Sequence, residues 1–179
     1  DHTNREWKGG SAGARIDWEP DDHNAYTLQG DYGHGSYVTP LLLPNPNLLT
    51  PGYVTSAPDN SYKTYSLLAR WTQRKSDTFD WSLQAQYNKI DRIELGGAHL
   101  VWQLADVDLG AHWKASDTHD INFGINGRML HDTTEGTSNF YFHQPSATDR
   151  WISGYIQDDI TLVPDKVRLT VGTKLEYNN

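Results

Sequence analysis

The sequence predicts an all-β fold, an antiparallel up-and-down sheet of about eight strands that forms a segment of a transmembrane β-barrel. Three observations predict it. Apolar and polar residues alternate over extended segments, which a strand allows and a helix does not. The clearest segments reach about 9–11 residues, the length a tilted strand needs to cross a bilayer, whereas soluble strands have about 5–6. Aromatic residues lie beside the expected turns, where transmembrane barrels carry interfacial rings.

The clearest strand covers residues 78–92. Every second residue is apolar or aromatic and the intervening residues are polar, the two sets being Phe79, Trp81, Leu83, Ala85 and Tyr87, and Asp80, Ser82, Gln84, Gln86 and Asn88. Successive side chains of a strand point to opposite faces of a sheet. We therefore expect the first set to contact lipid and the second set to face a wet lumen.

In chain order, residues 1–11 are polar and contain glycine, so we expect a loop. Alternation then predicts strands over 12–18, 26–33 and 62–73. A tight turn is expected at 19–24, because proline presets φ and Asp and Asn tolerate turn geometry. Trp18 and Tyr26 flank this turn, which would place both rings in one aromatic girdle.

A long loop is expected over residues 35–60. This segment holds five of the eight prolines, and proline cannot donate to a sheet ladder. Its leucines are Leu41, Leu42, Leu43, Leu48 and Leu49. They either anchor the loop against the rim of the barrel or form a surface that contacts substrate.

Four further strands are predicted over 100–113, 119–130, 150–162 and 167–177. A loop with Gly96 and Gly97 precedes the first of them. The turn at 114–118 resembles the turn at 74–78 in length and chemistry. The strand at 150–162 is less regular, since Asp158 and Asp159 interrupt both faces, and we expect this pair to mark the end of a strand near the periplasmic rim.

Residues 131–149 form the second substantial expected loop. The expected connections thus alternate between turns of about five residues and longer loops of variable length, as in outer-membrane barrels, which have short periplasmic turns and longer extracellular loops. A soluble sandwich has no reason to segregate its loop lengths in this way.

Composition limits the function classes. The chain has 179 residues, enough for one domain. Its net charge of −8 and pI near 5.3, without a basic stripe, argue against a nucleic-acid partner. The mean hydropathy of −0.71 is low although 12% of the residues are aromatic. Strands in which aromatic residues alternate with Asn, Gln, Asp and Thr explain both values. There is no cysteine, so no disulfide or thiolate metal site can form.

The segment 153–178 resembles a barrel segment of TonB-dependent outer-membrane receptors. The resemblance rests on Tyr155-Ile156-Gln157-Asp158, on the turn at Pro164-Asp165, and on a strand that closes in Gly172, Lys174 and Glu176 at every second position. Arg70-Trp71 and residues 83–88 are also similar to middle strands of that family. The motif-level match covers about thirty residues, and the strand rhythm covers nearly all the rest.

The resemblance implies a barrel of roughly 22 strands in the outer membrane of a Gram-negative bacterium. Such receptors import scarce ligands such as ferric siderophores, cobalamin or glycans, driven by the inner-membrane proton gradient. Residues 1–179 would then be a single partial barrel domain, an internal fragment without the plug domain. The implied partners are outer-membrane lipid, a small ligand such as a metal chelate, and the TonB complex through a plug that this sequence lacks.

No catalytic, cofactor or metal site is expected. The eight histidines are scattered without a metal-ligand spacing, and no nucleophile motif occurs. Asp158 and Asp159 are adjacent in a strand, so they point to opposite faces and cannot share a site. Tyr141, Phe142 and His143 in the second long loop are the candidate ligand-binding residues. The alternative is that their rings pack within the loop.

Two other classes stay open. The chain could be a complete eight-stranded barrel, closed on itself, with a structural or adhesion role. Such a small barrel must fill its interior with paired charges, whereas most lumen positions here are Asn, Gln, Gly and Thr. The chain could also be a soluble sugar-binding β-sandwich in which the aromatic faces form the core.

Overall fold

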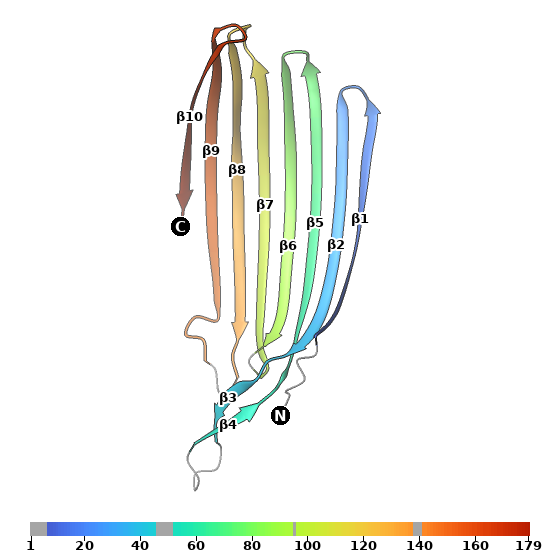
Figure 1. Ribbon diagram of the computed structural model, residues 1–179, viewed down its shortest axis with the longest axis vertical. Coiled ribbons are helices and arrows are strands. Elements are labelled where there is room, and N and C mark those ends of the chain that lie inside the picture. The colour runs from blue at the N-terminus through green and yellow to red at the C-terminus, as the bar shows by residue number, and fades with distance from the viewer. Residues whose placement is uncertain (1–6, 46–51, 95, 138–140) are drawn as a thin grey trace.

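The computed structural model describes residues 7–45, 52–94, 96–137 and 141–179. They form one eight-stranded antiparallel sheet and a separate two-stranded hairpin (Figure 1). The strands are β1 Trp7–Asp21, β2 Asn24–Val38, β3 Leu41–Pro44, β4 Tyr53–Ser56, β5 Asp59–Ser76, β6 Phe79–Glu94, β7 Ala98–Lys114, β8 His119–Glu135, β9 Ser146–Val163 and β10 Val167–Asn178. No helix within these ranges is long and apolar enough to cross a membrane.

The large sheet is an up-and-down meander. Its strand order is β1-β2-β5-β6-β7-β8-β9-β10, and every neighbouring pair is antiparallel. This confirms the all-β, eight-stranded antiparallel prediction. β1 and β10 lie at opposite edges of the sheet (Figure 1), and their described residues do not contact each other.

The strands are longer than the alternation predicted. β1 already begins at Trp7, so the loop expected over residues 1–11 is wrong from that residue on, while residues 1–6 lie outside the described part. β8 continues to Glu135 and β9 starts at Ser146, which leaves only residues 136–145 between them. The pair Asp158 and Asp159 does not end a strand, because β9 continues through Val163.

The long loop expected over residues 35–60 is also wrong in part. β2 extends into it to Val38, β5 begins at Asp59, and β3 and β4 form a hairpin between them. Pro44 is tolerated because every strand of a two-stranded hairpin is an edge strand. Leu42 is 66% exposed and therefore does not anchor the hairpin, while Leu48 and Leu49 lie outside the described residues.

The connection between β6 and β7 is short, although it lies on the long-loop side of the sheet. Only residues 95–97 separate these strands. Gly96 and Gly97 have φ values of +78° and +119°, a conformation that favours glycine. The Gly97 N–H donates to the Glu94 carbonyl at 3.0 Å. The expected contrast in loop length therefore holds for two of the three loops on this side, at 39–58 and 136–145.

The four turns at the other end are shorter than expected, covering residues 22–23, 77–78, 115–118 and 164–166. The turns at 77–78 and 115–118 differ in length, but their predicted likeness in chemistry is confirmed by their hydrogen bonds. The Thr78 N–H donates to Ser76 Oγ at 3.3 Å, and the Thr118 N–H donates to Ser116 Oγ at 3.2 Å. In the first turn, Asp21 Oδ1 accepts the N–H groups of His23 and Asn24, both at 2.8 Å.

Three turn carbonyls are bonded by the strand that follows the hairpin. The donors and acceptors are Arg74 N and His23 O, Lys114 N and Thr78 O, and Thr161 N and Thr118 O, each pair at 2.8 Å. The ladder between successive hairpins thus continues onto the turns themselves.

The large sheet is a single layer. Ala98 and Leu100 are the only buried hydrophobic residues in the described part of the chain, and many large apolar side chains are exposed. A β-sandwich requires a second sheet over the first, and the only other described sheet is the β3–β4 hairpin. The aromatic residues therefore do not form the closed interior that the sandwich alternative needs.

Candidate membrane-facing surface and polar face

Strand register sorts the side chains onto two chemically different faces. One face, here called the apolar face, contains two adjacent cross-strand rows of mainly apolar residues. The rows are Trp18, Tyr26, Trp71, Leu83, Leu109 and Ile125, and Ile16, Leu28, Ala69, Ala85, Val107, Gly127, Ile152 and Tyr177. The opposite face, here called the polar face, carries the intervening residues. The two predicted sets of residues 78–92 are therefore on opposite faces, each continuous with the like residues of neighbouring strands.

A ladder of rings crosses the apolar face near the short turns. Trp18 stacks on Tyr26 with centroids 5.2 Å apart, Tyr26 on Trp71 at 5.9 Å, and Trp71 meets Trp81 edge-on at 4.5 Å. The predicted grouping of Trp18 and Tyr26 is confirmed. We call these four residues the turn-side girdle.

Two indole N–H groups of this girdle have polar partners. Trp71 Nε1 donates to Asn24 Oδ1 and Trp81 Nε1 donates to Gln73 Oε1, both at 3.2 Å. Asn24 is the first residue of β2, beside the turn. An apolar ring with a bonded polar edge suits a boundary between hydrocarbon and water.

A second group of rings, the loop-side girdle, consists of Tyr32, Tyr65 and Tyr87. Tyr32 and Tyr65 have centroids 5.2 Å apart, and Tyr87 Oη donates to Gln103 Oε1 at 2.9 Å. In β6 the apolar set runs from Phe79 to Tyr87. Nine residues span about 26 Å along a strand, or about 20 Å of height at the usual barrel tilt, near the ~25 Å of an outer-membrane apolar band.

Beyond the loop-side girdle the apolar face becomes polar. Asp91 lies there and its Oδ1 is 2.9 Å from His99 Nε2. This hydrogen bond, opposed by partial burial, holds the pKa of Asp91 below its ordinary value. The strands therefore extend past the apolar band into a region where both faces carry polar groups.

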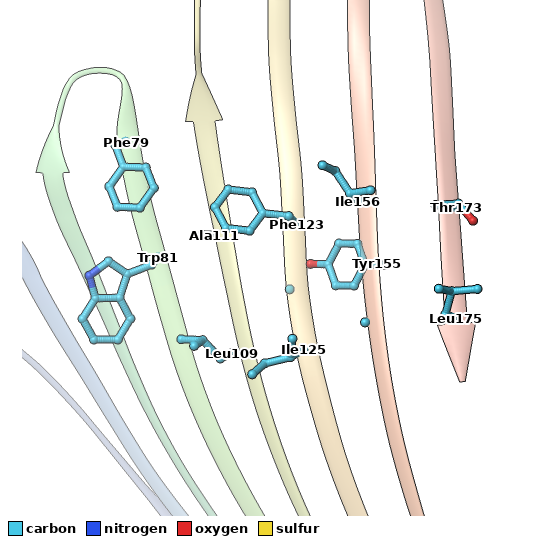
Figure 2. A pocket seen from close by; sticks show the side chains of 12 residues that line it. Phe79, Trp81, Leu109, Ala111, Phe123, Ile125, Tyr155, Ile156, Thr173 and Leu175 are labelled. Carbon is cyan, nitrogen blue, oxygen red and sulfur yellow. The ribbon is translucent and has the colours of Figure 1, made fainter. Parts of the chain in front are cut away.

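An open depression of about 960 Å³ lies on the apolar face across β6 to β10 (Figure 2). It forms where the small residues Ala111 and Gly154 lie among the larger side chains of Trp81, Phe123 and Leu175. Its shape and apolar lining suit the acyl chains of lipids.

The polar face is held together by cross-strand hydrogen bonds between directly paired residues. Thr27 Oγ1 donates to Asp17 at 2.7 Å, Arg70 Nε to Gln84 at 2.9 Å, and Arg128 Nε to Asp106 at 2.7 Å. Three of these six residues are exposed and three are half-buried. The face suits contact with water, and the bond between Arg128 and Asp106 pairs opposite charges across two strands.

Asp158 and Asp159 lie on opposite faces, as predicted from their spacing. Asp158 is on the apolar face, where its Oδ2 is 2.6 Å from His119 Nδ1, close to a short turn. Asp159 is on the polar face and accepts a hydrogen bond from Thr170 Oγ1. No three or more His, Asp or Glu residues in the described ranges form a group that could hold a metal ion.

The candidate ligand residues lie just ahead of β9. Tyr141 is 87% exposed, His143 is exposed and Phe142 is half-buried. The alternative that these rings pack within the loop is wrong for Tyr141. None of the three lines the hollow on the polar face described below.

Trp151 and Tyr155 of β9 are not among the ligand-binding residues expected from the sequence. These rings lie on the polar face, on either side of Ser153, and line a hollow with residues of β7, β8 and β10. Their signal in the sequence was two rings at polar positions of an irregular strand. Comparison with known families, curated proteins and solved structures gives no match.

Proposed function

We propose that this chain is part of the barrel wall of a TonB-dependent receptor in the bacterial outer membrane, importing a scarce ligand and carrying no catalytic site. The observation that supports this most is the band on the apolar face, bounded by the turn-side and loop-side girdles. In this proposal lipid takes the place of the missing second layer and the polar face lines the lumen.

The edges of the sheet favour a larger barrel over a closed one of eight strands. In lipid every backbone N–H and C=O must be paired, so neither β1 nor β10 can remain an edge. A closed eight-stranded barrel would place β1 against β10, but they lie at opposite edges. Pairing of both strands with further strands of a larger wall meets the requirement.

Depth-dependent quenching of tryptophan fluorescence by brominated lipids tests the proposal. The chain is reconstituted in vesicles as part of the whole barrel that the proposal requires, and one tryptophan of this chain at a time is replaced by phenylalanine. Trp71→Phe and Trp81→Phe should each remove part of the quenched signal. Trp102→Phe and Trp151→Phe, on the polar face, should leave the quenched signal nearly unchanged. A whole barrel that stays soluble without detergent, or equal quenching from both faces, contradicts the proposal.

A further inference from the structure

We propose that the polar face carries a binding subsite for a neutral saccharide, centred on Trp151 and Tyr155. The subsite would provide the ligand contact of the proposed importer. It rests on the proposed function, because it requires that the polar face is in contact with water. It lies in a hollow of about 720 Å³ across β7 to β10.

The two rings are spaced for a chain of sugar rings. Trp151 and Tyr155 are four residues apart on one strand, about 13 Å. Between them lies the small residue Ser153, which pairs with Asn126 on one side and Glu176 on the other. The hollow therefore has an aromatic ring at each end and hydrogen-bonding groups between them.

Tyr155 is held flat against the sheet by glycine. A Cβ placed on Gly124 would lie 2.7 Å from Tyr155 Cε1, and one placed on Gly110 would lie 3.4 Å from Tyr155 Oη. The ring thus extends across Gly124 toward Gly110, and Figure 2 shows its oxygen directed toward β8. Tyr155 is 40% exposed, so its ring is available for a ligand to stack on.

The charges in the hollow favour a neutral ligand. Arg128 is paired with Asp106 at 2.7 Å and Lys174 with Glu176 at 3.1 Å, so both cations already have a carboxylate partner. Asn126 Nδ2 also donates to Asp106 at 3.1 Å. Hydroxyl groups, which both donate and accept, match this mixture of donors and acceptors. A strongly anionic metal chelate would lack a free cation here and would meet a chain of net charge −8.

A third ring leads from the long-loop end toward the hollow. Trp102 of β7 pairs with Asp132, and Asp132 pairs with Ala147, four residues before Trp151. Trp102, Trp151 and Tyr155 therefore follow one another down the polar face at intervals of four residues. Such a series would give a saccharide successive stacking positions.

The test is calorimetric titration of the reconstituted whole barrel that contains this chain with maltohexaose, xylohexaose and chitohexaose, with a ferric tris-catecholate as the anionic comparison. At least one hexasaccharide should bind. Trp151→Leu, which keeps an apolar side chain of moderate size, should weaken that binding about tenfold through loss of a stacking ring. The matched control is Trp113→Leu on the apolar face, where Trp113 is 46% exposed, and it should bind like the wild type. Tyr155→Phe should retain binding, whereas Tyr155→Ala should lose it.

Three results would overturn the subsite: no hexasaccharide binds, Trp151→Leu binds as tightly as Trp113→Leu, or the ferric tris-catecholate binds more tightly than every saccharide. Quenching by brominated lipid is measured in the same vesicles. Because β1 and β10 need further strands beside them in lipid, the arms are read on the whole barrel: an inserted barrel that binds no saccharide refutes the subsite alone, and a barrel that does not insert refutes the proposed function.

Discussion

Replacing Gly124 by alanine should destabilise the sheet, because this position is covered on the polar face. The added Cβ would lie 2.6 Å from the Leu109 carbonyl oxygen and 2.7 Å from Tyr155 Cε1. Contacts this short require both the backbone of β7 and the tyrosine ring to move. We expect Gly124→Ala to lower the free energy of unfolding by about 1–3 kcal/mol, the usual cost of overpacking.

The matched control is Gly127→Ala in the same strand, where an added Cβ meets nothing within 4 Å. Alanine restricts the unfolded chain, so this variant should be unchanged or more stable by up to about 0.5–1 kcal/mol. Urea unfolding of the detergent-refolded protein, followed by tryptophan fluorescence, measures both. Adding Tyr155→Ala to Gly124→Ala should recover only part of the loss, since the contact with Leu109 remains. If Gly124→Ala and Gly127→Ala have the same stability, the reasoning from the covered glycine is wrong.

Three further predictions concern the ends of the strands. Asp21→Ala removes the acceptor of two turn N–H groups, so its unfolding midpoint in urea should fall below that of the control Asp22→Ala. Gly97→Ala should cost about 1–3 kcal/mol in the same assay, because its φ of +119° is strained for alanine, and an unchanged midpoint would show that the turn relaxes freely. Asp91 has a pKa lowered by its hydrogen bond to His99, so its ionised form favours the folded state. This contribution to the free energy of unfolding is fully present at pH values above the ordinary carboxyl pKa of about 3.9. It is lost as the pH falls through the lower pKa that Asp91 has in the folded state. NMR titration of the Asp91 carboxyl should show a lowered midpoint that His99→Ala returns toward normal.

The sequence predicts the middle of the sheet well because a single rule operates there. Between Trp81 and Tyr87 apolar and polar residues alternate without exception, so the alternation alone assigns each residue to a face of the sheet. Beyond the loop-side girdle the rule reverses, since polar groups such as Asp91 replace the apolar ones while apolar residues such as Leu100 appear on the other face. A search for constant alternation therefore ends each strand too early.

The hollow on the polar face could not be predicted in the same way. The hollow depends on which residues of neighbouring strands are opposite each other. The alternation of apolar and polar residues within a strand does not determine this register between strands. Tyr155 covers Gly124 because β8 and β9 pair in that register, and Ser153 is opposite Asn126 for the same reason. The short β3–β4 hairpin was not predicted, because the prolines of this segment cannot donate to a β-sheet hydrogen-bond ladder.

The bonded turn carbonyls have a consequence for how this sheet assembles. The carbonyls of His23, Thr78 and Thr118 each accept a hydrogen bond from the next hairpin along the chain. A partly formed sheet that ends at one of these hairpins therefore has a turn carbonyl at its edge without its hydrogen-bond donor. The next hairpin supplies that donor when it pairs, and its own turn then carries the next such carbonyl. If the hairpins pair in chain order, each of these carbonyls receives its hydrogen bond as the next hairpin is added. A hairpin that paired out of this order would leave one of the carbonyls without its donor.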